Sequence, residues 1–146
     1  MTSVRSHSQK TATDPLLVDG HSLTLEDVER VALRDCAVRL SPAALKQLGN
    51  SRAVVERLLD KREVVYGITT GFGKFKDVYI APEDSRTLQR NFLRSHAAGT
   101  GTSFDVPTVR AIMLLRANAL AKGFSGIRTE VVELLLALLN NGITPS

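Results

Sequence analysis

Residues 105–123 read DVPTVRAIMLLRANALAKG, a sequence that predicts one long apolar helix. Asp105 is a favourable N-cap, Pro107 suits the first helical turn, and Gly123 is typical of the position just after a helix. Between residues 111 and 121 the polar residues are Arg116 and Asn118. A helix that is apolar on every side is buried inside a larger protein, so we expect further polypeptide to cover this one.

More helices are predicted on both sides of this one, from capping residues and from apolar positions three and four apart. One opens at Thr24, where Asp27 completes a variant of the capping box. The next opens at Ser41-Pro42 and runs to about residue 62, with Gly49-Asn50 as a candidate break. Two others cover about 82–98 and 127–140. With a short strand around Val38 and a glycine-rich loop region, the expected fold class is mainly α.

The composition excludes several classes of protein. A length of 146 residues fits one domain, and 43% hydrophobic content is enough for a core. A lone cysteine excludes disulfides and a thiolate zinc site, and the three histidines lie too far apart for a local metal motif. No apolar run reaches membrane-spanning length, and residues 1–14 lack the apolar core of a secretory signal. We therefore expect a cytoplasmic protein without metal or membrane partner, and residues 1–14 as a disordered tail.

The net charge of +4 and the pI of about 9.6 raise the question of nucleic-acid binding. Aromatic residues make up 5% of the chain and tryptophan is absent, so platforms for stacking bases are scarce. Arg86, Arg90 and Arg94 share one face of the helix over 82–98. A solvated or subunit-facing surface is the preferred interpretation of this stripe over phosphate binding, and no nucleic-acid partner is expected.

Residues 64–75 read VVYGITTGFGKF and hold three glycines within seven residues, a pattern typical of an irregular loop. A phosphate-binding loop is rejected, because the Gly67 to Gly73 spacing is one residue too long and Phe75 replaces the required hydroxyl residue. An ordinary tight loop stays open as an interpretation. Against it stands Tyr66, since a phenol beside freed backbone N–H groups becomes a base where those surroundings stabilise the phenolate.

Two further groups of residues are candidates for ligand binding or catalysis. Gln89, Leu93 and His96 share a face of the helix over 82–98, where a histidine is more often a satisfied core residue than a ligand contact. Arg116 lies inside the apolar helix, and a buried guanidinium is costly without a partner. We interpret it as part of an ion pair or hydrogen bond to a segment outside this sequence, in preference to a catalytic group.

Five ordered motifs together resemble the N-terminal part of the histidine ammonia-lyase family, which belongs with the phenylalanine and tyrosine ammonia-lyases and the aromatic aminomutases. They are YGITTGFG at 66–73, LQRN at 88–91, SHAAG at 95–99, LAKGFSG at 120–126 and LLLALLNNGI at 134–143. The resemblance covers about residues 16–146. It implies that residues 15–146 form the N-terminal part of the lyase domain.

The resemblance also implies roles for individual residues. Tyr66 matches the tyrosine that removes the β-proton of the substrate, and Gly73 matches the last glycine of its loop, which lines the site. His96 matches the residue that contacts the substrate side chain. The Ser95-His96 pair resembles histidine-specific members, although some tyrosine-acting aminomutases share it. Gln89 and Ser95 are candidate supporting residues around them.

The family's electrophile is 4-methylidene-imidazol-5-one, which forms from an Ala-Ser-Gly tripeptide. This tripeptide does not occur in the sequence. In the family it lies shortly beyond the region matched here, so we expect a truncated chain that is inactive alone and belongs to a homotetramer when intact. The expected reaction converts L-histidine to trans-urocanate and ammonia. The alternatives are a tyrosine ammonia-lyase, an aromatic aminomutase, or a non-catalytic assembly module.

Overall fold

The structure is a computed structural model that describes residues 14–145. The predicted tail over 1–14 therefore lies, except for Asp14, outside the described residues. The elements, in chain order, are β1 (Leu16–Val18), α1 (Leu25–Arg34), β2 (Val38–Leu40), α2 (Pro42–Asp60), the short 3₁₀ turn η1 (Gly73–Phe75), α3 (Pro82–His96), α4 (Val106–Ala121) and α5 (Thr129–Asn140). The mainly α fold class is confirmed.

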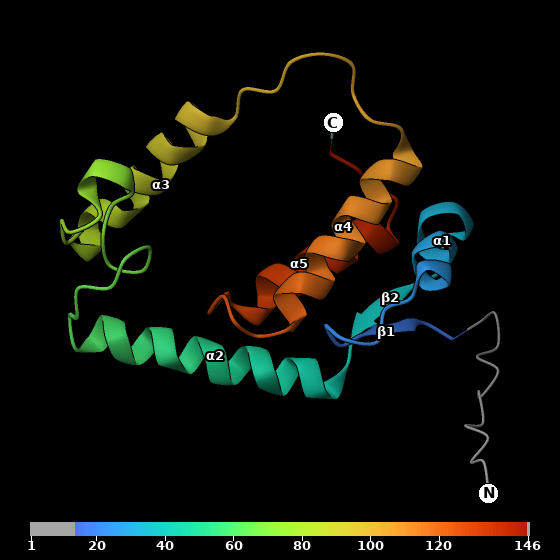
Figure 1. Cartoon of the computed structure of the whole chain (residues 1–146), viewed down its shortest axis with the longest axis horizontal. Coiled ribbons are helices and arrows are strands. Elements are labelled where there is room, and N and C mark those ends of the chain that lie inside the picture. Colours follow the sequence, from blue (N-terminus) through green and yellow to red (C-terminus); the bar gives the residue numbers. More distant parts are fainter. Residues whose placement is uncertain (1–13, 146) are drawn as a thin grey trace, which may run out of the picture.

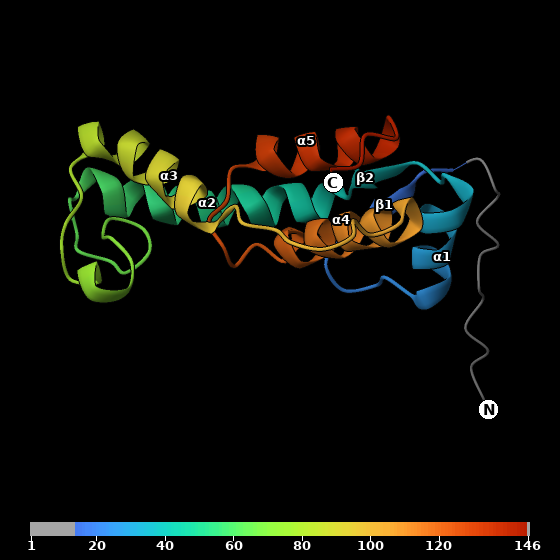
Figure 2. The same cartoon turned by 90° about the horizontal axis from the view of Figure 1, so that it is seen from above.

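The elements separate into a packed body and an outlying lobe (Figures 1 and 2). The body consists of β1, β2, α1, α4, α5 and the first half of α2. From there α2 leads away from the strands to the glycine-rich segment and α3. Residues 97–105 return the chain to the start of α4, so the candidate site residues of the lobe lie apart from the main hydrophobic core.

The helix starts predicted from capping residues are confirmed. Thr24 accepts a hydrogen bond from the backbone N–H of Asp27 at 3.2 Å, and the reciprocal bond completes the capping box of α1. Ser41 caps α2 through the N–H of Ala44 at 3.0 Å. Asp105 caps α4, and the hydroxyl and backbone N–H of Thr108 lower the pKa of its carboxyl.

The prediction that Gly49-Asn50 breaks the second helix is wrong, because α2 is continuous from Pro42 to Asp60. A glycine in a helix costs only about 1 kcal/mol relative to alanine. The strong Ser41-Pro42 start and the fully buried Leu48 side chain outweigh this cost.

The core lies around α4, which packs against α1, α2, α5 and β1. Its buried side chains come from every element of the body, and the largest fully buried ones are Leu16, Val18, Val31, Val38, Leu48, Leu114, Val132 and Leu139. The opposite face of α4 is more open, since about half of the Ile112 and Leu115 side-chain surfaces is exposed. This open face agrees with the expectation that further polypeptide covers the helix, which stays a prediction.

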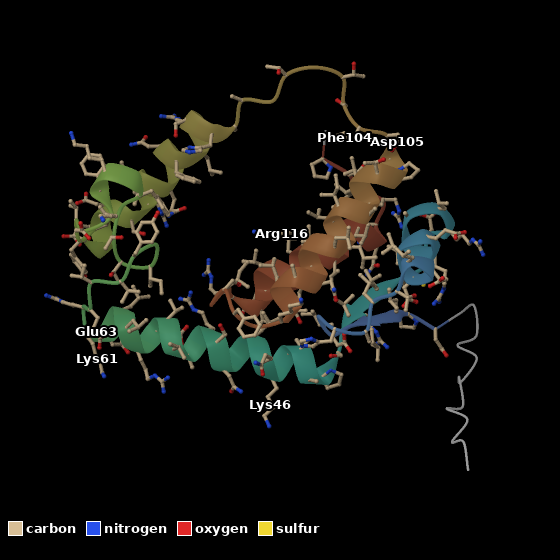
Figure 3. All side chains as sticks on the ribbon, in the orientation of Figure 1. Lys46, Lys61, Glu63, Phe104, Asp105 and Arg116 are labelled. Carbon is tan, nitrogen blue, oxygen red and sulfur yellow. The ribbon has the colours of Figure 1, made fainter. Side chains whose placement is uncertain are left out.

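The buried arginine of α4 within the described chain is Arg110. The partner expected for Arg116 belongs to a segment outside this sequence and stays a prediction. Arg116 is exposed and lies on the side of α4 opposite α1 (Figure 3). Arg110 is 5% exposed and donates to the carbonyl oxygens of Val31 and Leu139 at 2.9–3.0 Å. Its Nη2 also lies 3.0 Å from the carboxylate of Asp35. One guanidinium thus joins the ends of α1 and α5.

The two strands pair in parallel, with Leu16 opposite Val38 and Val18 opposite Leu40. The side-chain amide of Asn140 occupies the outer edge of β2. Its Oδ1 accepts from the N–H of Val38 and its Nδ2 donates to the carbonyl oxygen of the same residue, both at 2.9 Å. Asn140 therefore supplies the hydrogen bonds of a third strand and attaches the end of α5 to the sheet.

The LAKGFSG motif forms the turn between α4 and α5 and packs closely on α2. Gly123 has a positive φ of 72°, and a side chain there would collide with Gln47. The N–H of Gly126 donates to the hydroxyl of Ser51 at 3.0 Å. Gly126 has a positive φ of 64°, and a Cβ atom there would collide with the Val55 side chain, so close packing favours glycine at both positions. Within the described residues, no helix is long and apolar enough to cross a bilayer.

Candidate active site

The glycine-rich segment between α2 and α3 is held together by two buried threonines. The Thr69 hydroxyl donates to the carbonyl oxygen of Glu63 at 2.6 Å and accepts from the N–H of Val65 at 2.8 Å. The Thr70 hydroxyl accepts from the N–H of Gly67 at 3.3 Å and donates to the carbonyl oxygen of Gly71 at 3.0 Å. The base of this loop therefore has its own hydrogen-bond framework, independent of the main core.

Thr70 also pairs with Tyr79 in an antiparallel bridge, which brings the two ends of the loop together. The N–H of Ile80 donates to the carbonyl oxygen of Thr69 at 2.9 Å. The aromatic side chains of the segment remain on the outside, with Tyr66 63% exposed and Phe75 61% exposed. The framework thus presents the Tyr66 phenol on the surface of the lobe.

Gly73 begins η1 with a positive φ of 57°. A Cβ atom at this position would meet nothing within 4 Å. The backbone conformation therefore favours glycine here, although the surrounding space would accept a side chain.

An apolar hollow lies between the glycine-rich segment and α3, and we name it the aromatic groove. Its volume is about 620 Å³. The lining residues are Gly71, Phe72, Phe75, Ile80, Leu88, Asn91, Phe92, Ser95 and His96. The rings of Phe72 and Phe92 are 4.9 Å apart, and the His96 imidazole stacks on Phe92 at 4.1 Å. Such a surface is suited to a flat ring.

His96 is the last residue of α3 and is fixed by its own helical turn. Its Nδ1 lies 2.8 Å from the Ser95 hydroxyl oxygen and 3.0 Å from the carbonyl oxygen of Phe92. The Ser95 hydroxyl donates to the same carbonyl oxygen at 3.0 Å. The imidazole is therefore held through one nitrogen and through its face, and its other nitrogen makes no hydrogen bond to the described residues.

Gln89 lines a second hollow of about 400 Å³, together with Asp60, Thr69 and Thr70. This hollow shares Phe72, Ile80 and Leu88 with the aromatic groove. The supporting position proposed for Gln89 is thus beside the groove rather than within it.

The predicted site residues fall into two sets. Ser95 and His96 meet in the aromatic groove, with Gln89 adjacent. Tyr66 and Gly73 line neither hollow, so this chain does not by itself place the Tyr66 phenol beside the His96 imidazole.

Sequence reasoning also missed Phe92, although its position four residues before His96 predicts contact on a helix. Among the described residues there is no group of three His, Cys, Asp or Glu side chains that could hold a metal ion.

The comparisons with known proteins agree with these observations. The family model for aromatic amino acid lyases matches residues 23–146. The chain belongs to the aromatic amino acid lyase family. The resemblance drawn from the five motifs is thereby confirmed, and the lyase motifs at 66–73 and 95–99 are the parts of the chain that build the loop and the groove.

Individual lyase relatives are similar over most of the chain. The histidine ammonia-lyase of Gloeobacter violaceus is 52% identical over 136 residues, which are 93% of this chain and 26% of the relative. Ergothionase from Treponema denticola has a TM-score of 0.85 at 34% identity, covering 90% of this chain and 27% of that one. Tyrosine aminomutase from Streptomyces globisporus has a TM-score of 0.83 at 38% identity, covering 90% and 25%. The chain thus spans about a quarter of the length of the relatives it matches.

Replacing Thr69 by Val tests the framework of the loop. Valine keeps the shape of threonine but leaves the N–H of Val65 and the carbonyl oxygen of Glu63 without their partner. We expect local stability to fall by about 1–3 kcal/mol, measured as faster amide hydrogen exchange over residues 64–81. Thr69→Ser keeps the hydroxyl and should exchange like the wild type. Equal protection in the valine variant would contradict the assigned role.

Proposed function

We propose that this chain forms part of the active site of an ammonia-lyase that converts L-histidine to trans-urocanate and ammonia. The observation that carries the proposal is the aromatic groove, which ends on the imidazole of His96 and lies next to the loop that holds Tyr66. The roughly half identity to histidine ammonia-lyases supports this substrate.

Tyr66 is the proposed general base. The β-hydrogen of histidine is weakly acidic, so its removal must be coupled to departure of the amine. The Tyr66 phenolate oxygen takes the β-proton, the electron pair of the Cβ–H bond becomes the Cα–Cβ double bond, and the Cα–N bond breaks with its electrons leaving on nitrogen. The exposed position of Tyr66 on a separate lobe supports this role, because substrate and partner segments can reach it.

His96 is the proposed contact for the substrate side chain. The aromatic groove provides apolar surface for a ring, and His96 provides a polar group at its end. Gly73 supports the site by giving the loop after Tyr66 its left-handed backbone conformation. Ser95 and Gln89 act around these residues.

In the family, 4-methylidene-imidazol-5-one supplies the electrophile that makes the amine a better leaving group. The Ala-Ser-Gly tripeptide that forms it does not occur in this sequence. The residues of this chain fit proton removal and binding of the substrate ring, since they include a phenol and a groove for a ring. They include no electrophile that could activate the amine. We therefore propose that polypeptide from outside this sequence supplies the group, and that the chain alone is inactive.

We propose a cytoplasmic homotetramer for the intact enzyme. Support comes from the apolar side chains left exposed on α4 and α5, among them Ile112, Leu115 and Leu134. Such a surface is typical of one that other polypeptide covers. A non-catalytic assembly module would show the same surface and is tested by whether the chain joins an intact lyase without changing its activity.

The experiment is a full-length chimera, in which this chain is joined to the remaining three quarters of the Gloeobacter violaceus enzyme. We expect L-histidine to be converted to urocanate, followed by its near-ultraviolet absorbance and by mass spectrometry. The second candidate is a tyrosine aminomutase, because the Streptomyces globisporus enzyme is similar in structure, although at 38% identity against 52% for the Gloeobacter violaceus enzyme. A β-amino acid formed from tyrosine, with no urocanate from histidine, would establish the second candidate and refute the first.

A further inference from the structure

The three polar atoms at the end of α3 form a closed triangle. The His96 Nδ1, the Ser95 hydroxyl oxygen and the Phe92 carbonyl oxygen are 2.8–3.0 Å apart in every pair. A carbonyl oxygen can only accept hydrogen bonds. Its contact with Nδ1 is therefore favourable only when Nδ1 carries the proton.

The number of hydrogens leads to the same protonation state. With a proton on Nδ1, two hydrogens serve the triangle, one from the imidazole and one from the Ser95 hydroxyl. The hydroxyl then donates to Phe92 and accepts from His96. With the proton on Nε2 instead, the hydroxyl is the single donor, and the Nδ1 lone pair faces the lone pairs of the carbonyl oxygen. The first arrangement serves all three contacts, because the single Nδ1–H is shared between the Ser95 hydroxyl oxygen and the Phe92 carbonyl oxygen.

We propose that Ser95 and the Phe92 carbonyl group hold neutral His96 in the form protonated on Nδ1, so that the groove selects rings carrying a hydrogen-bond donor. In this form Nε2 is bare and acts as an acceptor. A ring that reaches it must offer an N–H or O–H group, as an imidazole or a phenol does and a phenyl ring does not. Ser95 is thus a positioning residue that acts through His96.

The proposal rests on the proposed function for the identity of the ring, whereas the protonation state depends on this chain alone. The stacking of His96 on Phe92 at 4.1 Å keeps the imidazole plane from turning away from the triangle. His21 lies in an exposed turn and makes no side-chain hydrogen bond to the described residues, so it offers an internal comparison within the same spectra.

The test is long-range ¹H–¹⁵N NMR of the imidazoles at about pH 8.5, where imidazole side chains are neutral. We expect the His96 signals to show a proton on Nδ1. Ser95→Ala should shift the tautomer ratio roughly 5-fold toward Nε2–H, Ser95→Thr should restore it, and His21 should not change in either variant. A wild-type His96 protonated on Nε2, or an unchanged ratio in Ser95→Ala, would overturn the proposal.

The chimera supplies the second measurement. We expect Ser95→Ala to lower the ratio of kcat/KM for histidine, or for tyrosine if that is the substrate, to kcat/KM for phenylalanine about 5-fold. An equal loss of kcat/KM for histidine, tyrosine and phenylalanine would refute ring selection through the Ser95–His96 contact. A chimera without lyase or aminomutase activity would refute the proposed function, whereas the NMR result would still decide the protonation state.

Discussion

Replacing Tyr66 by Phe in the full-length chimera lowers kcat for histidine by about 10²–10⁴-fold, because the phenol oxygen that accepts the β-proton is gone. The fold should not change. Tyr66 is 63% exposed, and its hydroxyl makes no hydrogen bond to the described residues, so removing one oxygen leaves no buried partner unsatisfied. Steady-state urocanate formation measures the loss, and circular dichroism checks the fold.

Tyr79→Phe is the matched control, because the chain has two tyrosines and both belong to the same lobe. Tyr79 pairs with Thr70 through backbone atoms, which phenylalanine also provides. We expect its kcat to stay within a few-fold of the wild type. If Tyr66→Phe retained full turnover, or if both variants lost activity equally, Tyr66 would not be the base.

Replacing Arg110 by Met destabilises the chain by about 2–5 kcal/mol. Methionine fills much of the same space but leaves the carbonyl oxygen of Val31 without a donor, and both Val31 and Leu139 are at most 1% exposed. The carbonyl oxygen of Leu139 loses its bond from the guanidinium but keeps the N–H of Gly142 at 3.2 Å. An unsatisfied buried acceptor costs about 1–3 kcal/mol, and a hydrogen bond from a charged donor contributes about 1.5–3 kcal/mol. The free energy of unfolding, obtained from urea titration of the 146-residue chain, measures the effect.

Arg116→Met is the control for this change, since it removes the same charge from an exposed position of the same helix. We expect it to change the free energy of unfolding by less than about 0.5 kcal/mol. Asp35→Asn should also have a small effect, because the Asp35 side chain is 87% exposed. Equal destabilisation by Arg110→Met and Arg116→Met would show that charge, rather than the buried hydrogen bonds, is responsible.

The contrast between these two arginines shows why sequence reasoning singled out Arg116 and overlooked Arg110, the one of the two that is buried within the described chain. Both lie in an apolar helix, and six residues of an α-helix correspond to about 240° of rotation, so they point to different sides. Nothing in the local sequence says which side the neighbours occupy. The partners of Arg110 are carbonyl oxygens 79 and 29 residues away, at the ends of two other helices.

In the candidate active site too, the sequence identifies some residues, whereas other contacts depend on the folded chain. The motif at 66–73 identifies Tyr66 and the glycines, and the motif at 95–99 identifies Ser95 and His96. The groove itself could not be foreseen, because it depends on Phe72 from the loop meeting Phe92 from α3. The buried Thr69 and Thr70 carry no periodic pattern, so their framework is visible only once the chain is folded.

Local sequence is enough to set the helix starts at Thr24, Ser41 and Asp105, because a cap is satisfied within three residues of itself. It is also enough for the family, since the motifs are contiguous. The buried face of α4 and the joining of α5 to β2 depend instead on tertiary packing. The Asn140 amide meets Val38 across 102 residues, and only chain folding brings such donors and acceptors within hydrogen-bond distance.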